Sequence, residues 1–251
     1  MNLVDIGYER VFEEEFGPTR KFFGTACAQK NTCTFWGDDA ERSHPNGGLY
    51  IWAQSNVNRK INFNAFANQS YGNLDYDFGA GPKYPRVSIP AVTQRAAQAA
   101  GLCNTSPLPV QCRAPQDPGA GKFFNFNAGM TYIPSKPLNI NVNFTKQRLT
   151  RNDTGLLAFD DNIVSLKATY QFTRFIFARG RIDFDSLASS YKGQFLFGWT
   201  PNPGTALYIG YNDDLTRNGY SQFSGQLEPG FRRNGRTVFI KMSYLFRKSF
   251  G

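Results

Sequence analysis

The sequence predicts an all-β protein: an antiparallel up-and-down transmembrane β-barrel with about ten strands in this chain and long extracellular loops. Three observations predict this fold. Aromatic residues make up 16% of the 251 residues and charged residues only 19%, which argues against both a disordered chain and a helical bundle. Apolar and polar residues alternate with a period of two along most of the chain. The connections between these segments are short at one end and mostly long at the other.

The clearest alternation runs from Phe124 to Thr145. Its even positions are apolar, as at Phe126 and Val142, whereas Asn125 and Asn141 stand among odd positions that are mostly Asn, Thr and Gly. A period of two places successive side chains on opposite faces of a strand, which helical spacing cannot do. The segment therefore predicts two strands joined by a turn.

The same pattern predicts the other strands and the connections between them. Further strands are expected near residues 3–11, 49–53, 61–67, 164–172, 176–184, 195–199, 207–211 and 238–246. Tight turns are expected at 56–59, 134–137, around 173 and at 201–204. The connections expected at the other end of the strands are residues 12–47, 79–121, 151–159, a short one at 187–190, and 216–234.

Alternation alone does not decide whether the apolar row faces lipid or a packed interior. The polar row is mostly small amides and hydroxyls, which suits a hydrogen-bonded lumen better than a solvated surface, and bulky aromatics lie near strand ends as in an interfacial girdle. The residues expected to face the membrane are Phe126, Val142, Trp199, Ile240, Tyr244 and Phe246. Those expected to line the lumen are Asn125, Asn141, Lys167, Arg179, Arg181, Asp183 and Asp185.

The five charged residues of the lumen set share one face of a predicted hairpin, and two interpretations stay open. They could line a pore and select solutes by charge, or they could form an ion-pair network that stiffens or plugs the barrel. Acidic pairs at loop edges, such as Asp75 with Asp77, are expected to be solvated charge rather than a cation site.

The four cysteines fall in two predicted long loops, Cys27 with Cys33 and Cys103 with Cys112. Two local disulfides are expected if these loops meet an oxidising compartment. Four free thiols and a four-cysteine zinc site are the alternatives, although neither spacing is Cys-x-x-Cys. With one histidine in the chain, a multi-histidine metal site is excluded, so we expect no metal, no cofactor and no catalytic residues.

Several segments resemble the end of a bacterial family of outer-membrane proteins of unknown function. These segments are 170–175, 193–199, 208–213 and 236–247. Members of that family carry a signal peptide, a sugar-binding sandwich similar to family 9 carbohydrate-binding modules, and a long barrel. The resemblance implies that residues 1–251 form one barrel domain, or the C-terminal section of a longer barrel. The aromatic row Tyr244, Phe246 and Phe250 is similar to the terminal signal read by barrel-assembly machinery.

The expected function is a passive channel or uptake component of the bacterial outer membrane, and a glycan solute rests on the family resemblance alone. The alternatives are a structural or partner-docking barrel with a closed lumen, and a soluble β-sandwich lectin. The expected partners are outer-membrane lipid and lipopolysaccharide, the barrel-assembly machinery, and a periplasmic or surface protein. A net charge of +9 does not by itself indicate nucleic acid, and we expect none.

Overall fold

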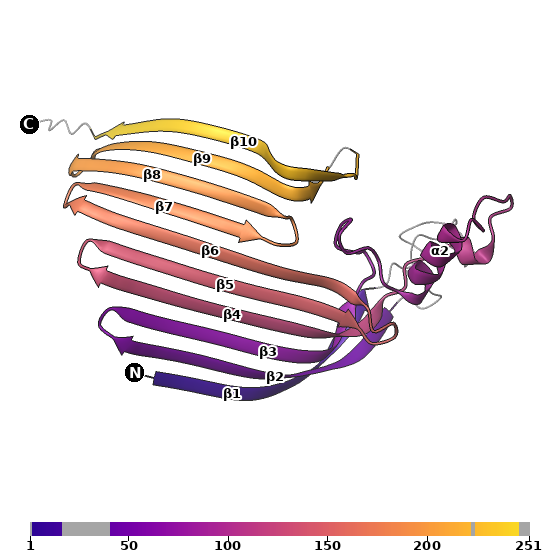
Figure 1. Ribbon diagram of the computed structural model, residues 1–251. Helices are drawn as coiled ribbons and strands as arrows, with labels where there is room; N and C mark the ends of the chain where they lie inside the picture. Colours follow the sequence, from indigo (N-terminus) through magenta and orange to yellow (C-terminus); the bar gives the residue numbers. More distant parts are fainter. Residues whose placement is uncertain (1, 17–40, 222–223, 246–251) are drawn as a thin grey trace, which may run out of the picture.

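The computed structural model describes residues 2–16, 41–221 and 224–245, which form one antiparallel sheet with its strands side by side in chain order (Figure 1). The ten strands are β1 (Asn2–Phe16), β2 (Glu41–Asn58), β3 (Ile61–Asp75), β4 (Gly119–Ser135), β5 (Leu138–Arg151), β6 (Leu157–Thr173), β7 (Ile176–Asp185), β8 (Ser190–Asn202), β9 (Thr205–Tyr220) and β10 (Leu227–Tyr244). The sheet is open, with β1 and β10 at its two edges. The all-β up-and-down prediction is confirmed.

Four two-residue turns join strands at one end of the sheet, as predicted. They are residues 59–60, 136–137, 174–175 and 203–204. Local chemistry explains their tightness: the Asn58 side chain accepts hydrogen bonds from the backbone N–H groups of Lys60 and Ile61 at 2.8 and 3.0 Å. Gly204 takes a φ of 97°, which other residues adopt only with strain. We call this end the turn end.

The opposite end, called here the loop end, carries longer connections at 76–118, 152–156, 186–189 and 221–226. Several strands reach further into this end than the alternation predicted. The expected loop at 216–234 is mostly strand, since β9 continues to Tyr220 and β10 begins at Leu227, with register shifts between Glu228 and Phe231 and between Arg233 and Gly235. These bulges and the polar residues on both faces hide the period of two while backbone pairing continues.

The strand pairing sorts the side chains onto two faces. The amide face carries Asn125 and Asn141, and the apolar face carries Phe126 and Val142. One directly paired row of the amide face is polar across nine strands: Asn56, Asn62, Thr131, Asn141, Lys167, Arg181, Gln194, Asn212 and Thr237. The polar row that the sequence predicted for one face therefore continues from β2 to β10.

No second sheet lies over the apolar face among the described residues, because they form a single sheet. Large apolar side chains of this face are solvent-exposed even on interior strands, as at Ile182 with 57% exposure and Phe195 with 50%. The described buried apolar cluster is small and lies instead at the loop end, where Val87 packs with Leu149 and Ala158. The apolar face therefore lacks the cover that a sandwich core would give it.

The 76–118 connection contains a helix, α2 (Ile89–Ala99), and a single 3-10 turn, η2 (Val110–Cys112), and it projects beyond the strand ends (Figure 1). Ser88 caps α2 by accepting a hydrogen bond from the N–H of Ala91 at 3.3 Å, and Pro90 lies in the first turn. None of the helices that the structure describes has the length and apolar character to cross a membrane.

Candidate functional site

Asparagine and threonine side chains on β4 and β5 bond to one another across the amide face. Asn141 Nδ2 donates to Asn139 Oδ1 at 2.7 Å, and Thr131 Oγ1 donates to Asn141 Oδ1 at 2.9 Å. Further towards the loop end, Asn127 receives a hydrogen bond from Thr145 and donates one to Asn125, at 2.9 and 3.0 Å. This ladder fixes the amide orientations, so the middle of the face presents ordered donors and acceptors.

The charged hairpin of β6 and β7 is partly an ion-pair network. Arg181 Nε lies 2.9 and 2.8 Å from the two carboxylate oxygens of Asp183, which also accepts a hydrogen bond from Ser165 at 2.5 Å. Asp185 instead accepts from the N–H of Ala188 at 2.8 Å and so belongs to the turn after β7. Lys167 and Arg179 have no ion-pair partner among the residues that the structure describes.

These cations border a hollow on the amide face with a volume of about 330 Å³. Its lining includes Lys167, Arg179, Arg181, Gln194, Leu196, Asn212 and Phe239. The residues come from strands β6 to β10, which the long-range pairing brings side by side. The hollow therefore combines positive charge, neutral amides and an apolar wall.

Two aromatic rings lie over glycines near this hollow. A Cβ atom at Gly198 would overlap the Phe177 ring, and one at Gly210 would overlap the Phe239 ring. Phe177 also contacts Tyr208, with ring centroids 6.4 Å apart. Glycine at both positions lets the rings lie against the backbone, which leaves an apolar surface on this part of the amide face.

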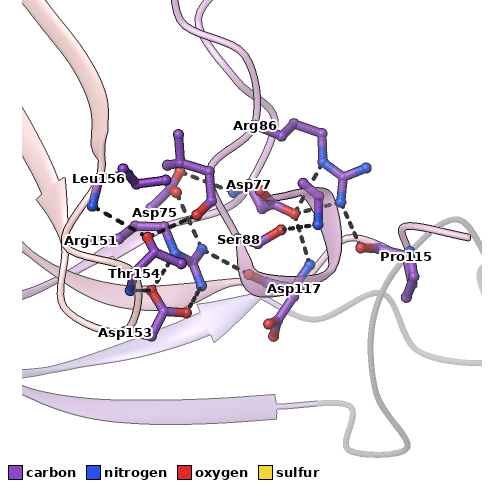
Figure 2. A network of polar contacts seen from close by, with 12 residues as sticks. Asp75, Asp77, Arg86, Ser88, Pro115, Asp117, Arg151, Asp153, Thr154 and Leu156 are labelled. Carbon is purple, nitrogen blue, oxygen red and sulfur yellow. Dashed lines mark hydrogen bonds and ion pairs between the residues drawn. The ribbon is translucent and has the colours of Figure 1, made fainter. Parts of the chain in front are cut away.

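At the loop end, a buried arginine anchors the 76–118 connection (Figure 2). The Arg151 side chain is 1% exposed; its Nη2 lies 2.6 Å from Asp153 Oδ2, and its Nη1 lies 3.2 Å from Asp75 Oδ2. Nη1 also donates to the backbone oxygen of Asp117 at 2.8 Å. A Cβ at Gly119 would overlap this guanidinium, so a side chain at that position would displace it. Arg151 thus joins both ends of the connection to β5.

A second ion pair closes the same connection on itself. Arg86 Nη2 lies 2.5 Å from Asp77 Oδ2, and the N–H of Asp117 donates to the same oxygen at 3.0 Å (Figure 2). Arg86 also donates to the backbone oxygens of Ala114 and Pro115, at 2.8 and 2.6 Å. The prediction that Asp75 and Asp77 are solvated loop charge is therefore wrong, because Arg151 pairs with Asp75 and Arg86 pairs with Asp77.

Arg151 and its carboxylate partners Asp75 and Asp153 are called here the anchor, and Arg151 and Asp153 affect each other's pKa values. Burial lowers the pKa of Arg151, but hydrogen bonds to Asp153 and Asp75 outweigh it and raise the pKa overall. The hydrogen bond from Arg151 lowers the pKa of the Asp153 carboxyl below its ordinary value, against the opposing effect of partial burial. Both groups are therefore charged at neutral pH.

The anchored connection packs onto the loop end of the amide face. Val87 lies in the buried cluster with Leu149, and Thr154 donates to the backbone oxygen of Val87 at 2.9 Å. Lys83 reaches the 186–189 connection, where it donates to the backbone oxygen of Ser186 at 2.7 Å. A cavity of about 420 Å³ remains beneath this connection. The connection therefore covers part of the loop end of this face.

The structure confirms one of the two expected disulfides. Cys103 and Cys112 are bonded, with their Cα atoms 5.5 Å apart, and Gln94 of α2 donates to the backbone oxygen of Cys112 at 2.9 Å. Cys27 and Cys33 lie outside the described residues. Within the described part of the chain, no group of three or more His, Cys, Asp or Glu side chains is placed to hold a metal ion.

Strand pairing places every residue expected to line the lumen on the amide face. Phe126, Val142, Trp199, Ile240 and Tyr244 share the opposite face, and Phe246 lies outside the described residues. Contact with a lumen or with lipid stays a prediction for both sets. Sequence reasoning missed the anchor at Arg151; the only signal for it was the excess of Asp around 75, 77 and 153.

No protein-family model matches the chain, and no curated protein matches it. The family resemblance and its sugar-binding sandwich therefore stay predictions.

The solved structures that are similar to the chain include outer-membrane proteins. One is OmpT, an outer membrane protein of Vibrio cholerae, with 12% identity and a TM-score of 0.37 over 94% of this chain and 76% of that one. Another is the P. putida toluene transporter TodX, with 13% identity and a TM-score of 0.33 over 98% and 70% of the two chains. A third is a Pseudomonas aeruginosa FadL homologue, with 10% identity and a TM-score of 0.31 over 96% and 61%. Similarity at this level assigns neither a family nor a solute.

Proposed function

We propose that this sheet is the wall of a β-barrel in the bacterial outer membrane and that the barrel is a passive channel or uptake component. The observation that carries the proposal is the uncovered apolar face, with Ile182, Phe195 and Trp199 exposed by 57%, 50% and 41% on interior strands. An apolar surface of this extent would cause a soluble protein to aggregate, whereas in a membrane acyl chains would cover it.

The edge of the apolar band runs obliquely across the strands, which supports a membrane boundary. On β5 the first charged residue of the apolar face towards the loop end is Lys146, whereas on β9 it is Asp213. Pairing through Gly193, Ile182 and Leu166 connects Asp213 to Val142, four residues nearer the turn end than Lys146. Averaged from β5 to β9, the first charged residue thus moves by about one residue per strand, which corresponds to a strand tilt of roughly 35° in a barrel.

Charged side chains on the apolar face mark where its strands would leave the hydrocarbon layer. Lys146 pairs with Asp160 at 2.7 Å, and Arg148 lies opposite Asp160 on the neighbouring strand. Basic groups at this level would meet the phosphates of lipopolysaccharide. Outer-membrane lipid and lipopolysaccharide are accordingly the partners we propose, together with barrel-assembly machinery that would receive the terminal strand during insertion.

The amide face is the proposed solute path. Its ordered amides, together with Lys167 and Arg179, which have no ion-pair partner among the described residues, offer hydrogen bonds and charge to a hydrated solute. A glycan is one solute that suits hydroxyl-binding amides with an aromatic platform. Tyr50 and Phe66 stack on this face with centroids 6.3 Å apart, beside Asn68.

A closed barrel that docks another protein is the second candidate, favoured by the anchored connection at the loop end. Residues of the 76–118 connection pack onto the amide face through Val87 and reach across to Ser186. If this cover seals the opening, the lumen conducts nothing and the projecting helix becomes the docking element.

Conductance in planar lipid bilayers tests the proposal. Folded protein is first identified by heat-modifiable migration on a detergent gel, and the same preparation is then added to the bilayer. A channel gives stepwise conductance, whereas heat-denatured protein gives none. Heat-modifiable protein that inserts but leaves the membrane closed would remove the channel and leave the docking barrel.

A further inference from the structure

We propose that Lys167 and Arg179, together with Arg181, form a binding site for a small organic anion. The carboxylate would lie between the three cations, and the apolar part of the molecule would lie against Leu196 and Phe239. This inference deepens the proposed function and rests on it in one respect: on a channel wall the site would make passage selective for anions.

Charge is segregated along the amide face, which is the first support for the site. On the described strands, all charged residues of this face from the Lys167 row to the turn end are basic: Lys167, Arg179, Arg181 and Lys241. The acidic residues of β6 to β9, such as Asp183, lie on the loop side of that row. Asp183 pairs with Arg181, but no ion pair neutralises Lys167 or Arg179 among the described residues, so the hollow keeps a net positive potential.

Three of the four nearby carboxylates already accept hydrogen bonds, which is the second support, whereas the buried Oδ1 of the fourth, Asp214, has no hydrogen-bond partner among the described residues. Asp183 is bound by Arg181 and Ser165, and Asp185 by the N–H of Ala188. Asp161 accepts from Ser186 Oγ at 3.2 Å and from the N–H of Leu187 at 3.1 Å. Asp214 lies directly opposite Lys192 on the next strand. None of these four bonds to Lys167 or Arg179 among the described residues, so both cations have donors to offer.

The residues that line the hollow are placed to contact both the carboxylate and the apolar part of the anion, which is the third support. Lys167 and Arg181 are directly paired on β6 and β7, and Arg179 follows two residues along β7, so the three charges surround one end of it. Gln194 and Asn212 add neutral donors at the same level, and the wall continues into Leu196 and Phe239. A guanidinium favours a planar carboxylate through paired N–H donors, and the ring of Phe239 over Gly210 offers a flat apolar contact.

Benzoate is a suitable probe, because it joins a carboxylate to a planar apolar ring, and benzyl alcohol is its neutral counterpart. Binding of each is measured by calorimetry on the full chain, folded in detergent and checked by heat-modifiable migration. We expect benzoate to bind and benzyl alcohol not to. The double variant Lys167→Gln/Arg179→Gln should weaken benzoate binding about tenfold or more, since two charge-assisted contacts are lost.

The matched control is Arg59→Gln/Lys136→Gln, which removes the same two residue types from exposed turns and should leave the affinity unchanged. The charge-preserving variant Lys167→Arg/Arg179→Lys should keep most of the affinity. Equal binding of benzoate and benzyl alcohol, or an equal loss in the control variant, would overturn the site.

The reversal potential in a KCl gradient separates this inference from the proposed function. An anion-preferring channel whose preference falls in Lys167→Gln/Arg179→Gln supports both. A conducting channel that prefers cations overturns the anion site and leaves the channel. A membrane that stays closed, with benzoate binding as expected, overturns the channel and leaves the site.

Discussion

At the scale of single residues, Arg151 is one of the largest fully buried side chains of the described chain. A guanidinium with 1% exposure is stable only while its partners neutralise it, and here Asp75, Asp153 and the oxygen of Asp117 do so from three parts of the chain. The same contacts hold the 76–118 connection against the sheet. Removing the cation leaves two carboxylates facing each other and frees that connection.

Replacing Arg151 by methionine should release the 76–118 connection. The expected cost to its closed state is on the order of 3 kcal/mol, because a buried pair loses one partner. Amide hydrogen exchange within residues 76–118 should accelerate in Arg151→Met. Arg148→Met, on the same strand but exposed, should leave that exchange unchanged. Unaltered exchange in both variants would show that Arg151 is no anchor.

Acid should weaken the same anchor. Asp153 has a pKa lowered from its ordinary 3.8 by Arg151, so it binds fewer protons in the folded than in the unfolded state. Its contribution is therefore fully present above pH 3.8 and is lost as the pH falls through the lowered value. Limited proteolysis of the 76–118 connection should increase at low pH in the wild type, and Asp153→Asn should flatten this response. A wild-type response that the substitution leaves intact would assign it to another group.

At the scale of strands and turns, much of the structure follows from local sequence. The period of two between Phe124 and Thr145 is enough to predict β4 and β5 and the faces of the residues within that range, because strand pairing preserves the alternation there. The loop ends of β9 and β10 were missed because bulges and polar residues conceal the period there. The anchor was missed since Asp75 and Arg151 are 76 positions apart, which no local pattern encodes.

Adjacent residues of β5 should respond in opposite ways to an added charge. Val142→Arg should destabilise the protein in lipid by about 2 to 4 kcal/mol, whereas Asn141→Lys should cost much less, since it adds a cation to a polar face. Denaturant unfolding in lipid vesicles measures both free energies. Equal costs at the two positions would contradict the assignment of the faces.

At the scale of the whole molecule, the open sheet has two edge strands that need hydrogen-bonding partners in a membrane. β1 and β10 are edges with unpaired backbone groups, and a bilayer offers those groups no partners. In a membrane the edges must therefore pair with each other or with further strands. The oblique edge of the apolar band, between Lys146 and Asp213, gives the tilt at which such a cylinder would stand.

The purified chain should need an amphiphile to remain dispersed. Side chains such as Ile240 and Met242, exposed by 71% and 77%, would otherwise associate between molecules. Light scattering after size-exclusion chromatography should show a monodisperse species in detergent and aggregates after detergent removal. A monodisperse, folded chain in plain buffer would argue for a soluble protein.

The central claim is that the apolar face meets lipid and the amide face does not, and native tryptophans on the two faces test it most directly. Trp199 lies on the apolar face and Trp52 on the amide face. Two variants are compared in vesicles, Trp36→Phe/Trp52→Phe with Trp199 retained, and Trp36→Phe/Trp199→Phe with Trp52 retained. Lipids brominated on their acyl chains should quench the fluorescence of Trp199 strongly and that of Trp52 little. Stronger quenching of Trp52 than of Trp199 would contradict the claim.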